Sequence, residues 1–279
     1  MYWDGGCLLV GAMLAFVLCR PWLGGFGALV TAAVSLSLFT ITPIWYLIGR
    51  GLAEISAGAF AWIAALLLIG SHSAGFPAVV AAGAFAVLAF FTRLNHMLFA
   101  GSLLVFLLPS TARAEMLRHP RELWRSVPRT RAAAYVGVLV VGVFLLAARA
   151  WVYTGELNPL AGTSLGLNHT GLTPTTVFSA EVWRNVLHSL FAQMIVNEVF
   201  DARGLIVYVG CLAAFLAVLQ VPLFSRLPLA ASLALLGALL GAFVAHAHGY
   251  PGRFSVHLVP LATATTALAT LVMASVRNR

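Results

Sequence analysis

Apolar runs close to the length needed to cross a bilayer recur along almost the whole chain. An α-helix needs about 20 mostly apolar residues to span a membrane. The runs cover about residues 6–19, 23–48, 55–71, 75–91, 94–109, 133–150, 204–224, 228–246 and 257–275. Of the 279 residues 61% are hydrophobic and only 9% are charged, which excludes a soluble globular domain, since such domains average about 25% charged residues. We predict an all-α polytopic transmembrane helical bundle of about nine spans, forming a single integral membrane domain over residues 1–279.

The charges between these runs predict the orientation of the bundle. All sixteen basic residues are arginines, and the net charge is +8. With the arginine-rich loop 110–132 placed in the cytoplasm and the spans alternating, the inner side holds ten arginines and two acids, and the outer side holds six of each. This is the asymmetry that the positive-inside rule describes. The N-terminus is therefore expected outside and the C-terminus in the cytoplasm.

The arginines also predict which molecules the protein contacts and from which kind of organism it comes. Because the arginine excess lies in loops between apolar runs, it predicts contact with membrane lipids and not with nucleic acid. Arginine without lysine, together with abundant Ala, Leu, Val and Gly, is typical of GC-rich bacterial genomes. We expect a protein of the bacterial inner (cytoplasmic) membrane.

The longest predicted outer loop, 151–203, contains a segment with a different pattern. Over residues 179–200, apolar side chains such as Val182, Leu190 and Ile195 recur at helical spacing, with polar residues largely opposite. The pattern predicts an amphipathic helix lying in the outer interface. It would either pack over the bundle or contact lipid.

Polar residues near the outer ends of the spans are the candidate functional residues. Arg50 and Glu54 stand four apart after a proline-containing span, where they would either pair with each other or bind a ligand. Arg93, Asn95 and His96 link two spans with almost no loop. An arginine there would either bind a phosphate through charge-assisted hydrogen bonds or extend to lipid head groups.

A third outer cluster contains His246, His248, Arg253 and His257. It suits an anion pocket, and a two-residue histidine spacing without a matching carboxylate is weak evidence for a metal site. The sequence predicts no particular cofactor, and it neither predicts nor excludes a bound divalent cation. It has no phosphate-cradling Gly-Lys loop, HExxH motif or CxxC pair.

These outer clusters resemble bacterial membrane glycosyltransferases of the GT-C fold, a group that includes protein O-mannosyltransferases and lipid A aminoarabinose transferases. Thr42-Pro43 followed by Arg50 and Glu54 resembles the family's outer turn, Ser-Pro … Tyr-x-Arg-x-Gly … Glu. The stretch 91–95, Phe-Thr-Arg-Leu-Asn, is similar to its Leu-Thr-Arg-Pro-Asn junction. The late Gly-Arg-Phe-Ser-x-His-Leu segment is also similar.

The resemblance implies transfer of a sugar from a polyprenyl-phosphate carrier to an acceptor on the outer face of the membrane. The family's base is usually an acid on the first outer loop, and this chain begins where the second family span would begin. The first family span and its acidic loop are therefore expected to be missing, through a late start codon, an N-terminally truncated form or real loss. Glu54 is then the better and Asp4 the weaker candidate catalytic acid. The residues expected to bind substrate are Arg50, Arg93, Asn95, His96, Arg253 and His257.

The main alternative is a membrane transporter or lipid-carrier flippase that transfers no sugar. Such a protein also needs an amphipathic cavity, but it favours polar groups at mid-membrane and broken helices in two related halves. Here the polar groups lie at the outer ends of the spans. A noncatalytic membrane scaffold is the third reading.

Overall fold

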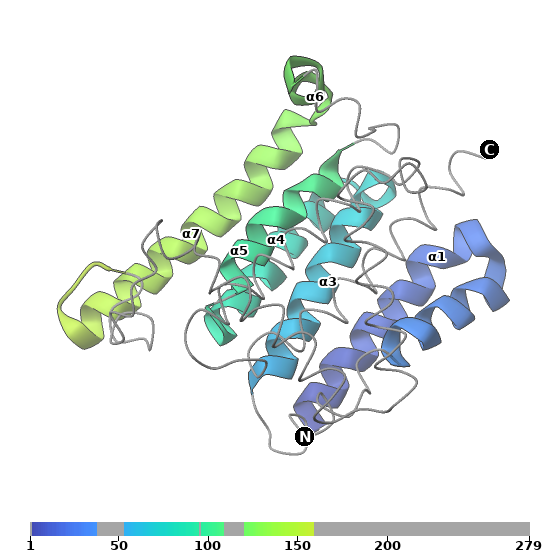
Figure 1. The fold of residues 1–279 in the computed structure, drawn as a ribbon, viewed down its shortest axis with the longest axis horizontal. Helices are drawn as coiled ribbons and strands as arrows, with labels where there is room; N and C mark the ends of the chain where they lie inside the picture. The colour runs from blue at the N-terminus through green and yellow to red at the C-terminus, as the bar shows by residue number, and fades with distance from the viewer. Residues whose placement is uncertain (1, 38–52, 95, 109–119, 159–279) are drawn as a thin grey trace, which may run out of the picture.

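In the computed structural model, the residues that the structure describes are 2–37, 53–94, 96–108 and 120–158 (Figure 1). Within these ranges the chain forms helices joined by short turns and contains no strand, so the all-α prediction is confirmed there. Two segments, Trp3–Pro21 and Arg129–Thr154, are long and apolar enough to cross a membrane. Shorter apolar helices cover Leu23–Ala33, Ile55–Ser71 and Phe76–Thr92.

The prediction of nine spans is therefore met only in part. The runs 204–224, 228–246 and 257–275, and the amphipathic helix predicted over 179–200, lie outside the described residues.

Helix α1 (Tyr2–Ser37) contains the first predicted span and the described part of the second in one kinked element. The kink lies at Gly24, where φ is 71° and ψ is 175°, and Pro21 precedes it by less than one turn. A positive φ favours glycine, which has no Cβ to clash with the backbone. The two arms of α1 fold back beside each other at this point (Figure 1). The predicted break between 19 and 23 thus falls just before the kink, where the backbone of Gly24 is not helical and two helical arms meet.

Helix α3 (Ala53–Ala74) runs parallel to the first arm of α1. Near its start, Ser56 contacts Asp4, and near its end Gly70 lies against the side chain of Leu18. The residue numbers rise together along the contact, which is what parallel helices require. The second arm of α1 accounts for this arrangement, because it returns the chain toward the end where it began (Figure 1).

Helix α4 (Phe76–Thr92) packs antiparallel against α3. A single residue, Gly75, joins the two helices; its φ is 77° and its N–H donates to the carbonyl of Ser71 at 3.0 Å. The predicted span 75–91 therefore matches α4 within one residue. The predicted span 94–109 differs more, because it forms a short α-helix, α5 (His96–Ser102), followed by a 3-10 turn, η2 (Leu103–Leu107).

Helix α7 (Arg129–Thr154) runs parallel to α4. Gly83 of α4 lies against Val138, and Gly142 lies against Val87 and Phe90 one turn further along both helices. Small residues at such contacts let two backbones approach closely. Helix α7 begins within the predicted loop 110–132 and extends four residues past the predicted end of its span.

Two further hydrogen bonds attach α7 to the rest of the bundle. The Tyr135 hydroxyl is buried and donates to the carbonyl of Ala100 in α5 at 2.8 Å. The Arg131 guanidinium donates through Nη1 to the carbonyl of Ser71, near the end of α3, at 3.2 Å. The short helix α6 (Pro120–Ser126) precedes α7 and projects beyond the core (Figure 1).

These helix directions divide the charged residues between two ends of the bundle. The Asp4 end contains the starts of α1, α3 and α5 and the ends of α4 and α7; the Arg131 end contains α6, the start of α7 and the kink of α1 (Figure 1). The charged residues placed at the Asp4 end are Asp4, Glu54, Arg93, Arg149 and Glu156. Those placed at the Arg131 end are Arg20, Arg121, Glu122, Arg125, Arg129 and Arg131. Among the described residues, the Arg131 end therefore has all of the arginine excess.

Candidate functional site

The Asp4 end gathers the described residues that sequence patterns single out. Asp4 lies in the first turn of α1, and Glu54 is the second residue of α3. Arg93 follows the last residue of α4, and His96 begins α5. The other predicted substrate-binding residues lie outside the described residues; they are Arg50, Asn95, Arg253 and His257.

Asp4 is held inside the bundle by a residue that sequence reasoning missed. Its side chain is only 4% exposed, and its Oδ1 accepts a hydrogen bond from the hydroxyl of Ser56, which is also buried. A buried carboxylate is costly unless hydrogen bonds replace its water. The partial positive charge at the start of α1 favours an acid in this first turn. In the sequence, Ser56 is one hydroxyl at the edge of an apolar run, and only the parallel register of α1 and α3 brings it to Asp4.

The junction between α4 and α5 fixes the position of Arg93. Its backbone is extended, with φ −148° and ψ 115°, and its N–H donates to the carbonyl of Ala89 at 2.9 Å. The carbonyl of Arg93 in turn accepts the N–H of His96 at 3.0 Å. These bonds hold the short connection between α4 and α5, where the sequence predicted two spans joined with almost no loop.

The two side chains of this junction differ in their exposure. His96 is completely buried, whereas the Arg93 side chain is half-buried, with its Nε atom inside the bundle. A guanidinium at the end of α4 lies near the partial negative charge of that helix terminus. Its planar donor groups suit a phosphate or a carboxylate. The structure thus brings Arg93 to the same end as the two candidate acids.

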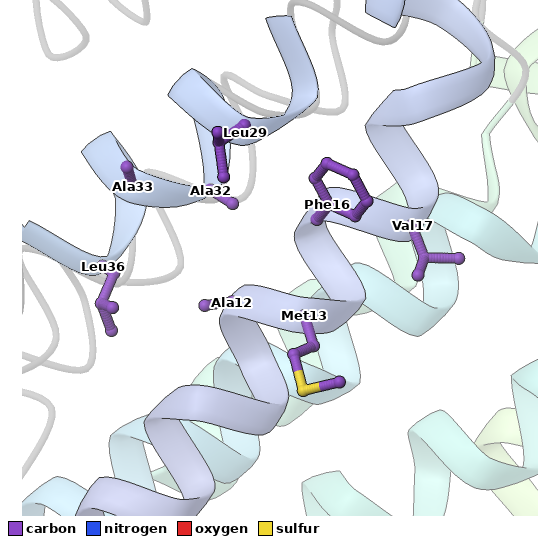
Figure 2. Close-up of a pocket in the computed structure, with 8 residues that line it drawn as sticks. All are labelled: Ala12, Met13, Phe16, Val17, Leu29, Ala32, Ala33 and Leu36. Carbon is purple, nitrogen blue, oxygen red and sulfur yellow. The ribbon is translucent and has the colours of Figure 1, made fainter. Parts of the chain in front are cut away.

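An apolar groove of about 570 Å³ lies between the two arms of α1 (Figure 2). Its lining comes from both arms and consists entirely of apolar residues. They are Ala12, Met13, Phe16, Val17, Leu29, Ala32, Ala33 and Leu36. Ala12 lies eight positions after Asp4 on one helix, so the groove begins roughly 12 Å along the helix axis from Asp4. Its lining residues offer no polar side chain to recognise a ligand.

No metal site is found in the part of the chain that the structure describes: no three side chains of His, Cys, Asp or Glu gather there. His246 and His248 lie outside these residues, so the divalent cation that the sequence left open is not tested by this geometry.

Comparison with known proteins adds no relative. No protein-family model matches the chain, and no match was found among curated proteins or among solved structures. The GT-C resemblance of the clusters at 42–54, 91–95 and 252–258 therefore stays a prediction from the sequence.

Proposed function

We propose that this chain is a polytopic membrane glycosyltransferase that transfers a sugar from a polyprenyl-phosphate carrier to an acceptor on the outer face of the bacterial inner membrane. The observation that carries the proposal is the gathering of the polar residues singled out in the sequence at one end of the bundle. They are Asp4, Glu54, Arg93 and His96. They come from three helices and from the residue that follows a fourth, and they span more than ninety positions, yet the helix directions bring them to the Asp4 end.

Two observations support a position in the membrane. Large apolar side chains project outward from the bundle; Phe26 on α1 is 81% exposed and Phe144 on α7 is 69% exposed. Extended apolar surfaces of this kind are rare on soluble monomers. The second observation is the charge difference between the ends, which has the sign that the positive-inside rule requires if the Arg131 end faces the cytoplasm.

The residues of the Asp4 end suit the chemistry of sugar transfer. An acid, Glu54 or Asp4, would accept the proton of the acceptor hydroxyl, whose oxygen then bonds to the anomeric carbon of the sugar. The bond between that carbon and the phosphate oxygen breaks, and the lipid phosphate leaves with the electron pair. A guanidinium such as Arg93 would offset the charge on the leaving phosphate.

The groove of α1 supports a lipid-linked donor over a soluble nucleotide sugar. An isoprenoid chain is a flexible hydrocarbon, and within a membrane an apolar groove can hold it only through van der Waals packing against the wall. With the phosphate near Arg93 at the Asp4 end, the chain would run toward the groove between the two arms (Figure 2).

The test is binding of a short-chain polyprenyl phosphate to the purified protein. Losing a charge-assisted hydrogen bond costs about 1.5–3 kcal/mol, so Arg93→Ala should weaken binding by roughly ten- to a hundredfold. Arg93→Lys should also weaken it, because an ammonium lacks the planar fork. The matched control is Arg20→Ala, which removes an exposed arginine at the opposite end. Equal affinity in all variants would contradict the phosphate site.

A second measurement separates sugar transfer from transport. With a polyprenyl-phosphate sugar as donor, Glu54→Gln or Asp4→Asn should retain binding and lose release of the lipid phosphate. If the wild-type protein in vesicles moves a labelled polyprenyl phosphate between leaflets and releases no sugar, the flippase alternative replaces the transferase.

A further inference from the structure

A second polar surface lies at the Arg131 end, away from the proposed sugar-transfer site. It is formed by α6 and the first residue of α7, and we call it the α6–α7 basic surface. Its members are Arg121, Trp124, Arg125 and Arg129, all of them exposed. The exposed fraction of the Trp124 side chain is 68%. In Figure 1, α6 stands clear of the other labelled helices.

The arrangement on α6 concentrates these side chains on one side of the helix. Residues three and four positions apart are neighbours on a helix surface, so Arg121 lies beside both Trp124 and Arg125. Glu122 is exposed as well; it is turned by about 100° from Arg121 and lies three positions before Arg125, so it is a neighbour of Arg125 on the side away from Trp124. Around the helix the order is Trp124, Arg121, Arg125 and Glu122, so the two arginines lie between the indole and the carboxylate.

The position of this surface is fixed by the rest of the bundle. Arg131 ties the first turn of α7 to the end of α3 through the carbonyl of Ser71, and the Ala132 N–H donates to the carbonyl of Pro128 at 2.9 Å. Only Val127 and Pro128 separate α6 from α7. The surface thus lies where the apolar helix α7 starts, which is the level of the lipid head groups if α7 crosses the membrane.

We propose that the α6–α7 basic surface binds the head groups of anionic phospholipids in the cytoplasmic leaflet. Tryptophan favours the boundary between head groups and hydrocarbon, and guanidinium groups bind lipid phosphates through paired hydrogen bonds. Basic residues near an anionic membrane contribute about 1 kcal/mol each. The surface has three arginines and one acid, so it carries a net positive charge. This charge attracts an anionic head group more strongly than a zwitterionic one. The inference rests on the membrane position argued under Proposed function and not on sugar transfer.

The test uses the full chain in nanodiscs whose phosphatidylcholine or phosphatidylglycerol has brominated acyl chains, which quench nearby tryptophans. The difference between the wild-type protein and Trp124→Phe isolates the Trp124 signal. Brominated phosphatidylglycerol should quench that signal more than brominated phosphatidylcholine at equal mole fraction. Arg125→Gln should lower the relative association constant for phosphatidylglycerol about fivefold, which corresponds to 1 kcal/mol. High salt should reduce the preference as well.

Arg149→Gln is the matched control, because Arg149 is an exposed arginine at the opposite end and lies over an aromatic ring, that of Tyr153. It should leave the preference at Trp124 unchanged. Equal quenching by the two lipids, or an equal effect of Arg125→Gln and Arg149→Gln, would overturn the proposal. Because this readout requires neither donor nor acceptor, a failure here would leave the Arg93 result standing, and a failure of sugar transfer would leave this preference intact.

Discussion

The contact between α4 and α7 depends on a glycine, and Gly142→Ala tests it. A Cβ at this position would lie 2.6 Å from a methyl carbon of Val87 and 2.7 Å from the ring of Phe90. Carbon atoms cannot approach this closely, so the two helices would have to separate or both side chains would have to change rotamer. Overpacking of this kind costs typically about 1–3 kcal/mol. Alanine also favours a helix by up to about 1 kcal/mol over glycine, which partly offsets that cost.

Gly137→Ala separates these two effects. Gly137 lies on the same helix, and a Cβ there would meet no atom within 4 Å. Both variants gain the same helix preference, so the difference between them isolates the contact. We expect Gly142→Ala to unfold with a free energy about 1–3 kcal/mol below that of Gly137→Ala in a denaturing-detergent titration of the purified protein. Equal free energies would refute the packing of α4 against α7 at this glycine.

Two buried hydrogen bonds give further predictions. Ser56→Ala removes a donor to the buried Asp4 carboxylate and should lower the free energy of unfolding by about 1–3 kcal/mol; the same substitution in an Asp4→Ala background should cost less than half as much, and an equal cost in both backgrounds would deny the pair. Tyr135→Phe removes the bond to the Ala100 carbonyl and should cost about 0.5–1.5 kcal/mol in the same titration. An unchanged midpoint for Tyr135→Phe would show that α5 and α7 do not meet there.

The positions of the helices followed from the sequence more closely than their packing did. The run 55–71 lies inside α3, and the run 75–91 differs from α4 by one residue at each end, because a long apolar run predicts a helix whatever its neighbours are. A helix that is apolar on all sides does not reveal which side faces another helix. The sequence therefore did not predict that Gly142 contacts α4.

The candidate site was predictable to a similar degree. Arg93 and His96 stood out because charged and polar residues are rare beside apolar runs, and the structure brings them to one junction. Ser56 did not stand out, because a serine is common in apolar helices and its partner is 52 positions away in the chain. Only the parallel register of α1 and α3, which the kink at Gly24 permits, relates it to Asp4.

The most direct test of the account is whether the two ends of the bundle lie on opposite sides of a membrane. Arg121→Cys and Leu157→Cys place a thiol at an exposed position before and after α7, in a chain whose Cys7, Cys19 and Cys211 are changed to alanine. A thiol reagent that does not cross membranes should label Leu157→Cys in intact cells and Arg121→Cys only after the cells are opened. Labelling of both positions in intact cells, or of neither until the cells are opened, would contradict a membrane-spanning α7 and the proposals that depend on it.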